Sequence, residues 1–462
     1  DEGHGPSEDY SSIAHRTGNG HWLASYEIHL VDGRLASYRR LAEGEAAAEG
    51  AQVWHAYLEV AKPASWFNNQ TYVDTLNRDA MERFIEVTHE RYYREVGESF
   101  GKCIPAIFTD EPQFSHKQSL PRAESQEDVT LPWTEDLPET FATSYGENIL
   151  DTLPEIFWEL PEGAASVWRY RYHDHVCERF TQAFSDTIGD WCEKHGIALT
   201  GHMMSEHSLR AQTNALGESM RGYRSFQIPG IDVLLDRCEE EFSTAKQAQS
   251  AAHQYGRSGV LSELYGVTNW DFDFPGHKRQ GDWQAALGVT YRVHHLSHVS
   301  LAGESKRDYP ASINYQSPWH KEYPVVEDHF ARVNVMLSSG KPKVRIGVIH
   351  PIESYWLCSG PIDQTEEERA ERESNFLDLI QWLLYGLLDF DFISESLLPN
   401  QANTPKHGGF AVGEMEYDTI LVPGLRTIRS TTLARLEAFA EAGGTVVFAG
   451  EIPSLVDAMP SD

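Results

Sequence analysis

Between residues 104 and 338, short apolar runs alternate with longer segments in which apolar positions recur at helical spacing. This alternation predicts parallel strands joined by right-handed helical crossovers. A polar or ionisable side chain closes each strand, which fits a (β/α)8 barrel better than a doubly wound sheet. The strands are expected at residues 104–109, 196–200, 231–235, 259–262 and 289–296. The helices are expected at residues 80–96, 166–195, 209–222, 239–255, 276–287 and 324–338.

Upstream of this region, alternating β-branched and aromatic residues at 21–31 and 51–61 predict two more strands, with a turn at Asp32-Gly33. If residue 104 opens the fourth barrel strand, the segment around Trp66 supplies the third, and the first two are expected upstream of residue 1. We therefore expect a barrel truncated at its N-terminus, in a chain that is a piece of a longer protein. Residues 113–164 are polar and rich in proline, which predicts a functional loop or lid.

The pattern changes after the linker at residues 339–342, so we expect a catalytic domain at 1–338 and a second domain at 339–462. The second domain alternates short strands with helices and is predicted to be an incomplete flavodoxin-like α/β domain. Its first strand is followed by neither a GxGxxG motif nor a P-loop, so we expect no nucleotide cofactor. The strands are expected at residues 344–349, 390–393, 419–422 and 445–449, and the helices at 367–388 and 432–442.

The formal net charge of −32 argues against nucleic acid or an anionic membrane as a partner. The 38 basic residues comprise 11 Lys and 27 Arg, and an acid-rich, Lys-poor surface suits high salt. Five scattered cysteines without a CxxC pair predict buried free thiols rather than a disulfide framework. The sequence contains no recognisable signal peptide and no run of ~18 apolar residues. In a piece of a longer protein this leaves the localisation open.

Two carboxylates at predicted strand ends are the strongest candidates for chemistry. Asp110-Glu111-Pro112 follows the strand at 104–109, and proline ends that strand because it has no N–H for the sheet. Glu263 closes the strand at 259–262, and in a barrel the fourth and seventh strands face each other across the mouth. Glu111 and Glu263 are therefore predicted to be a catalytic acid and its partner in glycosidic bond cleavage. The alternative is that both are structural helix caps.

Aromatic and histidine side chains gather around these carboxylates in the sequence. The aromatic residues after Glu263 are candidates for stacking on sugar faces, although we expect Phe272 and Phe274 to belong to the core. The aromatic candidates are Tyr265, Trp270 and Trp283. The histidines at or after strand ends are candidates for binding sugar hydroxyls or a metal, and they are His202, His207, His294, His295 and His298. No HExxH motif supports zinc. Glu206 with Asp110 offers oxygen ligands that suit calcium, and an ion-paired Glu206 is the alternative.

Several motifs together resemble the glycoside hydrolases related to the α-L-rhamnosidases of family 106. The resemblance covers about residues 70–355, and no single motif is specific by itself. The motifs are Tyr72-Val73-Asp74-Thr75-Leu76-Asn77, Phe108-Thr109-Asp110-Glu111-Pro112, Leu199-Thr200-Gly201-His202, Ile228-Pro229-Gly230-Ile231-Asp232, Ser262-Glu263-Leu264-Tyr265-Gly266, Gly281-Asp282-Trp283-Gln284-Ala285 and Ser317-Pro318-Trp319.

The resemblance implies a barrel enzyme of much greater length, with Glu111 as the acid and Glu263 as the base. It also implies a calcium ion near the sugar, which favours Asp110 and Glu206 as ligands. Asp1-Glu2-Gly3 is similar to an acidic loop near the family's substrate pocket, but the residues after it depart from that pattern. The second domain looks like the amidotransferase-like domain of several glycosidases, an assembly element that implies a homo-oligomer. The expected substrate contacts are Asp110, His202, Tyr265, Trp270, Trp283, His294, His295 and Trp319.

The leading hypothesis is therefore an O-glycoside hydrolase for a deoxyhexose-containing glycan, with rhamnose as the first sugar to test. A β-galactosidase-like hydrolase that retains the anomeric configuration is the alternative enzyme. Carboxylate separations of about 5–5.5 Å predict retention, and roughly 6.5–9.5 Å predict inversion. A non-catalytic carbohydrate-binding or assembly protein would not need Glu111 and Glu263 to face one cavity. A metal-dependent hydrolase would need three converging histidines.

Overall fold

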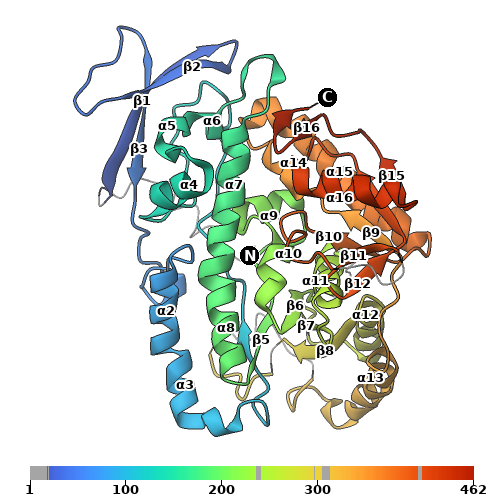
Figure 1. The fold of residues 1–462 in the computed structure, drawn as a ribbon. Coiled ribbons are helices and arrows are strands. Elements are labelled where there is room, and N and C mark those ends of the chain that lie inside the picture. Colours follow the sequence, from blue (N-terminus) through green and yellow to red (C-terminus); the bar gives the residue numbers. More distant parts are fainter. Residues whose placement is uncertain are drawn as a thin grey trace.

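The computed structural model describes residues 18, 20–235, 241–295, 297–303, 313–403 and 408–461. Asp1-Glu2-Gly3 and Cys238 lie outside these residues. At the centre is a sheet of five parallel strands in the order β4-β5-β6-β7-β8 (Figure 1). All five strands are predicted from the sequence, and their order along the sheet follows their order along the chain, as in an α/β barrel. They are β4 (Ala106–Thr109), β5 (Ala198–Gly201), β6 (Ile228–Asp232), β7 (Val260–Leu264) and β8 (Val289–His294).

The predicted crossover helices are present, and two of them form one long column beside the sheet (Figure 1). Ser166 begins this column because its side chain accepts a hydrogen bond from the Arg169 N–H. The column continues through a π-helical segment at Thr181–Asp186, so the helix predicted at 166–195 is confirmed with an irregular middle. The helices around the sheet are α7 (Val167–Phe180), α8 (Thr187–Lys194), α9 (Leu209–Ala215), α10 (Ser219–Gly222), α11 (Phe242–Gln254), α12 (Phe274–Ala286) and α13 (Pro324–Leu337).

The N-terminal strands form a separate antiparallel sheet rather than part of the central one. β1 (His21–Val31) lies between β2 (Arg34–Leu41) and β3 (Gln52–Leu58), and Asp32, with φ of 50°, begins the predicted turn. The prediction that the Trp66 segment supplies a barrel strand is wrong, because Ser65–Phe67 is a 3-10 helix. Among the described residues, the segment forms only the isolated bridge Ala64–Gln70, and it leads into α2 (Arg78–Val87) and α3 (His89–Val96).

The long polar segment at 113–164 is not the single loop or lid that its composition suggests. It contains the short helices α4 (Leu137–Tyr145), α5 (Ile149–Thr152) and α6 (Pro154–Phe157). Phe141, Ile149 and Trp158 from this segment are fully buried in the main hydrophobic cluster. Two of these helices have four residues, which is too short for a helical period to show in the sequence.

The third predicted strand is shifted by three residues. We expected residues 231–235 with Asp236 at the end, but β6 is Ile228–Asp232, and Asp236 lies outside the described residues. The prediction followed the apolar run Val233-Leu234-Leu235 after Asp232. β6 includes Pro229, which is in register with Gly201 in the short pairing of β6 with β5. This shift places Asp232, rather than Asp236, at the end of the strand.

The C-terminal unit contains a second parallel sheet in the order β10-β9-β13-β15, and its four predicted strands are confirmed. It also contains small sheets that the sequence did not predict. The main strands are β9 (Ile346–Ile349), β10 (Phe390–Ile393), β13 (Thr419–Pro423) and β15 (Thr445–Ala449), and the helices are α14 (Ile352–Trp356), α15 (Ile362–Tyr385) and α16 (Ser430–Glu441). The small strands are β11 (Phe410–Val412), β12 (Met415–Tyr417), β14 (Thr427–Ile428), β16 (Leu455–Val456) and β17 (Met459–Pro460).

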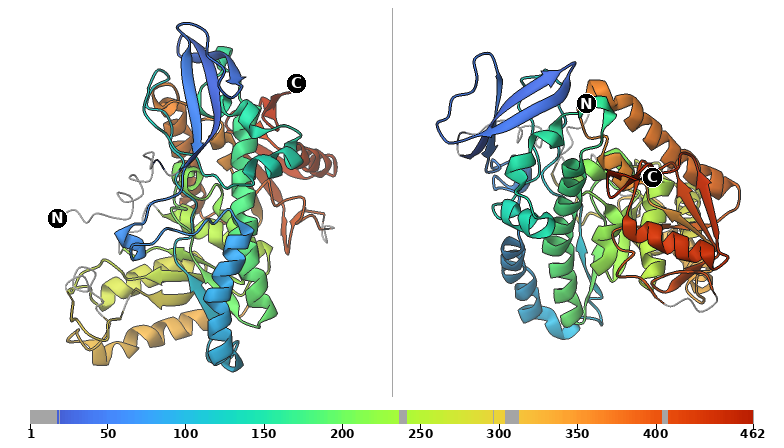
Figure 2. Two further views of the ribbon diagram at one scale, coloured as in Figure 1. Left: turned by 90° about the vertical axis from the view of Figure 1, so that its left-hand side faces the viewer. Right: turned by 45° about the horizontal axis from the view of Figure 1, so that its top comes forward.

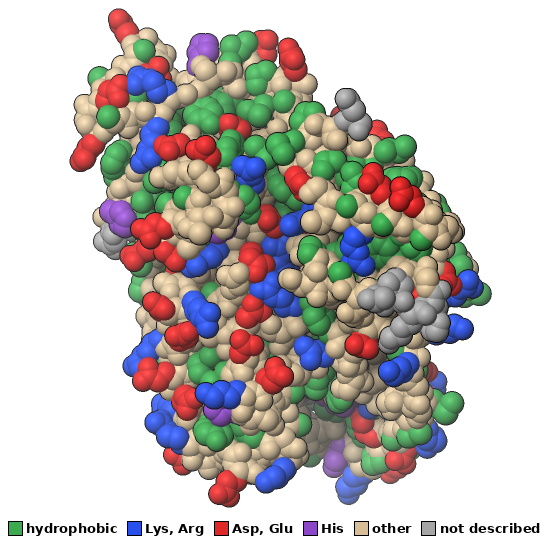
Figure 3. Space-filling view, viewed as in Figure 1, with side chains coloured by type: hydrophobic (Ala, Val, Ile, Leu, Met, Phe, Trp, Pro, Cys, Tyr) green, Lys and Arg blue, Asp and Glu red, His purple; other side chains and the backbone are tan. Residues whose placement is uncertain are grey.

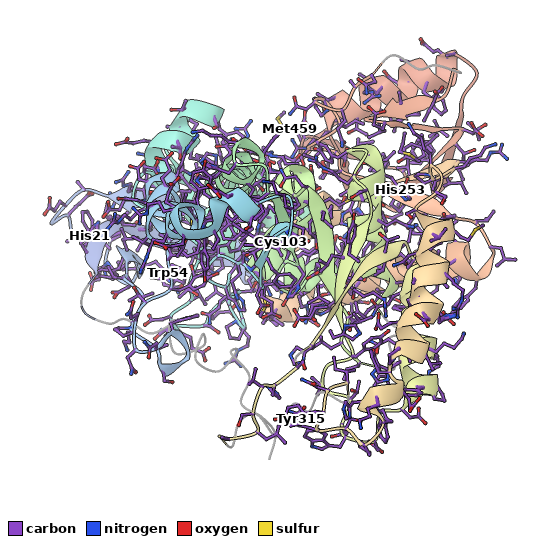
Figure 4. All side chains as sticks on the ribbon, turned by 90° about the horizontal axis from the view of Figure 1, so that it is seen from below. His21, Trp54, Cys103, His253, Tyr315 and Met459 are labelled. Carbon is purple, nitrogen blue, oxygen red and sulfur yellow. The ribbon has the colours of Figure 1, made fainter. Side chains whose placement is uncertain are left out.

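The C-terminal unit packs closely against the helices that cover the central sheet (Figure 2). One hydrophobic cluster joins Tyr170 and Met220 to Trp356 and Phe392 across residues 339–342. Charged pairs also cross this boundary: His253 on α11, labelled in Figure 4, lies with Nδ1 2.9 Å from Asp391 of β10. The linker therefore joins two sheets whose surrounding layers share a core.

On the face drawn in Figure 3, acidic and basic side chains are interspersed rather than separated into large patches. Within the described part of the chain, no helix is both long and apolar enough to cross a membrane.

Candidate active site

Four neighbouring strands each bring one ionisable side chain to the carboxyl edge of the central sheet. Asp110 follows β4, His202 follows β5, Asp232 ends β6 and Glu263 lies near the end of β7. The strands approach closely here because β5 ends in Gly201, with φ of 122°. A Cβ atom at Gly201 would lie 1.9 Å from the Thr109 carbonyl oxygen, so only glycine fits.

The His202 imidazole forms the floor of this cluster, with its side chain fully buried. Nε2 donates a hydrogen bond of 2.9 Å to Asp110 Oδ1 and lies 3.8 Å from Asp232 Oδ2. Nδ1 lies 3.8 Å from Glu263 Oε2. One ring therefore faces carboxylates that follow or belong to three different strands, and it is hydrogen-bonded to one of them.

The electrostatics of the cluster are those of one cation among several acids. Burial opposes the charged form of His202, but the hydrogen bond to Asp110 and the nearby negative charges outweigh it and raise its pKa to about 9. The same hydrogen bond keeps the pKa of Asp110 below its usual value. Burial raises the pKa of Asp232 to about 7, and the charge of Glu263 adds to this shift.

The two predicted catalytic glutamates both belong to this cluster. Ligand atoms of Glu111, His202 and Asp232 lie within 4.8 Å of one another, and so do those of Asp110, His202 and Glu263. Burial raises the pKa of both Glu111 and Glu263, which favours a protonated carboxyl at the site. Glu111 and Glu263 thus lie around the same imidazole, which suits an acid and its partner in one reaction.

Glu111 adopts an unusual backbone conformation, with φ of 48°. Left-handed backbone is unfavourable for residues other than glycine and asparagine, and such strain concentrates at functional sites. Pro112 follows directly and restrains the chain just after the glutamate. The strained turn aims a side chain from the strand end of β4 at its neighbours on β5 and β6.

The two carboxylate–histidine sets are also the places where described residues are arranged to hold a metal ion. Each set contains only one histidine, so among the described residues three histidines do not converge, contrary to the metal-dependent hydrolase hypothesis. Neither set includes Glu206. Its carboxylate is buried and accepts a hydrogen bond of 3.4 Å from the Tyr223 hydroxyl, so the structure does not group it with Asp110 as a ligand set.

Several of the predicted substrate contacts make close contacts within the protein. Tyr265 is 3% exposed and packs against Phe272, which lies in the core as expected. Trp283 contacts Phe242 with ring centroids 5.4 Å apart, so its ring lies between α12 and α11. His294 Nε2 lies 2.8 Å from the Tyr323 hydroxyl and 3.1 Å from Glu327 Oε1. Tyr265 is therefore buried, whereas Trp283 and His294 are half-buried and packed against neighbouring side chains.

Three other predicted contacts keep an accessible surface. Trp270, in the loop after β7, is 37% exposed. His295 follows β8 and is close enough to Asp110 for their charges to interact. Trp319 is half-buried at the start of the 3-10 helix His320–Glu322. Trp270 and His295 are therefore the better candidates for contact with a ligand at the strand ends.

Asp232 is the site residue that the sequence reasoning missed. It is in register with Glu263 on the next strand, and its side chain is 24% exposed. The resemblance motif Ile228-Pro229-Gly230-Ile231-Asp232 contained it, and ending the strand at that motif would have identified it.

Glu206 provides a test of the electrostatics that does not require activity. Burial raises its pKa to about 8, so above its ordinary pKa near 4.5 the folded state becomes less stable than it would be with a neutral side chain there. Each pKa unit corresponds to ~1.4 kcal/mol, so a rise from 4.5 to about 8 sets an upper limit of about 5 kcal/mol. Because the site can relax around the charge, Glu206→Gln is expected to gain at least about 2 kcal/mol of stability over the wild type at pH 8, and little at pH 5.

This comparison is made by urea unfolding from pH 5 to 9 in buffer with EDTA. The exposed variant Glu98→Gln is the control and should follow the wild-type curve. A Glu206→Gln variant that is equally destabilised at every pH would show that the buried carboxylate is not under electrostatic stress.

Comparison with known families identifies the motifs around these strand ends. The family model of glycoside hydrolase family 106, α-L-rhamnosidase, matches residues 59–461. The chain belongs to this family. The match includes the strand ends of the site and most of the C-terminal unit, and it confirms the resemblance. Comparison with curated proteins gives no match.

Solved structures of several glycosidases share the fold. The rhamnosidase from Novosphingobium sp. PP1Y has a TM-score of 0.60 and 20% identity, over 84% of this chain and 35% of its own. A family 42 exo-carrageenase from Bacteroides ovatus has a TM-score of 0.57 and 13% identity, over 85% of this chain and 55% of its own. A catalytic mutant of the β-galactosidase Gan42B from G. stearothermophilus has a TM-score of 0.54 and 11% identity, over 84% of this chain and 57% of its own.

At these identities the structural similarity concerns the fold alone, and it confirms an α/β fold of TIM-barrel type. The chain spans about a third of the length of the Novosphingobium rhamnosidase, because the match covers 35% of that protein.

Proposed function

We propose that this family 106 chain carries the acid–base centre of an O-glycoside hydrolase that removes α-L-rhamnosyl residues from a glycan. The observation that carries the proposal is the placement of Glu111 and Glu263 around one buried imidazole at the carboxyl ends of parallel strands. Glu111 acts as the general acid that protonates the leaving oxygen. Glu263 acts as the base or nucleophile at the anomeric carbon.

Calcium fits this centre as a further component. The cluster is rich in carboxylate oxygens, which are the ligands that Ca²⁺ prefers, whereas the charged His202 ring is unsuited to bind a cation. Asp110 is the best ligand in the described part of the chain, because its side chain is 74% exposed at the strand end. A bound calcium ion would orient sugar hydroxyls and offset the surplus of negative charge.

The edge strands and strand orders of the two parallel sheets support proposals for the complete barrel and for the C-terminal domain. β4 and β8 are the outer strands of the central sheet, and a complete (β/α)8 barrel would close between them with further strands. Residues 339–462 are proposed to be a separate flavodoxin-like or amidotransferase-like domain, since the order β10-β9-β13-β15 matches the start of that topology. Its edge strand β15 exposes Val447 and Phe448, which supports a role in homo-oligomer assembly.

The function is tested by hydrolysis of a panel of aryl glycosides, each with and without EDTA. We expect 4-nitrophenyl α-L-rhamnoside to be the preferred substrate, with other glycosides at least about 10²-fold slower, a difference that substrate hydroxyl contacts commonly provide. EDTA should reduce the rate at least about tenfold, and added Ca²⁺ should restore it. Preference for a β-galactoside would overturn the rhamnosidase assignment, and full activity in EDTA would overturn the role of calcium.

A further inference from the structure

Asp232 is a carboxylate with an incomplete set of partners at the centre of the site. Its Oδ2 lies 3.8 Å from His202 Nε2, which is beyond hydrogen-bond distance, and that nitrogen already donates to Asp110. Its Oδ1 is buried and has no hydrogen-bond partner among the described residues. Leaving a buried acceptor unpaired destabilises the folded protein, so its retention calls for a donor from outside the described chain.

The surroundings of Asp232 indicate what kind of hydrogen-bond donor can bind to it. The charged groups that face it are His202, Glu263, Glu111, Asp110 and Glu206, of which only His202 is a cation. An ionised carboxylate can only accept hydrogen bonds, and a sugar hydroxyl is a neutral donor that can reach a partly enclosed oxygen. The 24% exposure of the side chain leaves a path for such a group.

The position of Asp232 also limits which hydroxyl it can meet. It is in register with Glu263 on the adjacent strand, and its ligand atom lies within 4.8 Å of that of Glu111. If these two glutamates act on the glycosidic bond, Asp232 is beside the ring whose bond is broken. Its partner is then a ring hydroxyl near the anomeric carbon rather than a group on a distant sugar.

We infer that Asp232 is a specificity-determining residue whose Oδ1 accepts a hydrogen bond from a ring hydroxyl of the sugar being cleaved. This inference rests on the proposed function and adds a third carboxylate to the acid–base pair. It makes Asp232 a sensor of sugar configuration, because a hydroxyl of the opposite configuration or a missing hydroxyl leaves the buried oxygen unpaired.

The test is a double-mutant cycle in which one change is a substitution of Asp232 and the other is the removal of one hydroxyl from the substrate. The wild type, Asp232→Asn and Asp232→Ala are assayed with aryl α-L-rhamnoside and its 2-, 3- and 4-deoxy analogues. We expect Asp232→Ala to lose about 10²- to 10³-fold in kcat/KM on the parent substrate. For one deoxy analogue, Asp232→Ala and the wild type should have similar kcat/KM. The analogue already lacks the hydroxyl that Asp232 binds, so removing the carboxylate as well costs little more.

The cycle is needed because deleting a hydroxyl also changes the intrinsic reactivity of the glycoside. That change is common to wild type and variant, so it cancels in the coupling between the two deletions. Asp232→Asn keeps an acceptor oxygen and should recover part of the rate. Asp190→Asn on α8, with an exposed side chain, is the matched control and should leave all rates unchanged.

Other outcomes separate this inference from the proposed function. Multiplicative losses with every deoxy analogue would overturn the inference while rhamnosidase activity stands. A higher Ca²⁺ requirement in Asp232→Ala, again with multiplicative losses, would make Asp232 a metal ligand and also overturn it. If another glycoside is the substrate, the rhamnosidase proposal falls, and deoxy analogues of that sugar decide the inference. No hydrolysis of any glycoside would overturn both.

Discussion

Glu263→Gln is expected to lower kcat/KM for an aryl α-L-rhamnoside by at least about 10³-fold, whatever the leaving group. The substitution keeps the size of the side chain but removes the carboxylate that activates water or attacks the sugar carbon. Glu263 lies within β7 and is in register with Asp232 of β6. The strand therefore holds the glutamine side chain of the variant in the same place. The loss should therefore appear mainly in kcat rather than in KM.

Glu111→Gln is expected to behave differently, because an acid matters most when the leaving group is poor. With 4-nitrophenolate, which leaves without protonation, the loss should be about tenfold, whereas with an alkyl rhamnoside it should reach about 10³-fold. The dependence of the rate on leaving-group pKa, measured on a series of phenyl rhamnosides, separates the two roles. The exposed variant Glu98→Gln is the control.

Three results would contradict these assignments. Retention of wild-type activity by Glu263→Gln would remove it from the chemistry. Equal losses for Glu111→Gln on good and poor leaving groups would show that Glu111 positions the substrate and does not donate a proton. A reversed pattern, in which Glu263→Gln is sensitive to the leaving group, would exchange the two roles.

Arg429→Ala is expected to lower the free energy of unfolding by about 3–5 kcal/mol, the usual cost of removing one partner from a buried ion pair. Arg429 Nε lies 2.7 Å from Glu353 Oε1, and its Nη2 lies 2.6 Å from Asp174 Oδ1 on α7. The Glu353 side chain is 3% exposed, so the substitution leaves a carboxylate with little access to water. Urea unfolding at pH 7.5 measures the loss.

The control for this prediction is Arg345→Ala. Arg345 pairs with Asp418, but the two side chains are 72% and 54% exposed, and an exposed pair contributes only about 0–1 kcal/mol. Because the hydrophobic cluster spans both units, we also expect wild type and Arg429→Ala each to unfold in one transition. Similar losses for Arg429→Ala and Arg345→Ala would show that the interface between the units is not supported by this pair.

The strands and the position of the two glutamates at one sheet edge could be predicted because their signals are local. A buried parallel strand shows as a short apolar run, and the ionisable residue after it marks the edge of the sheet. That reasoning located four of the five strands of the central sheet to within two residues at each end, and it brought Asp110, Glu111 and Glu263 to one edge. It failed at β6, where the apolar residues after Asp232 extended the predicted strand past its real end.

Residue type alone could not assign the aromatic and histidine candidates. Tyr265 and Trp270 are five residues apart after the same strand, yet one is 3% exposed and the other 37%. His202 and His294 both lie at strand ends, but His202 faces the carboxylates whereas His294 bonds to Tyr323. Burial and partner choice depend on which segments pack nearby, and these segments are far away in the sequence.

By itself, the sequence determined the alternation of strands and helices, the two glutamates and the family. The spacing of apolar residues and the family motifs each depend only on residues that are close together in the sequence. The tertiary structure alone decided that the N-terminal strands form their own sheet, that the two units share a core, and that His202 and Asp232 complete the site. The Asp110–His202 hydrogen bond joins residues 92 positions apart, and contacts of this kind arise only when separate strands are brought together.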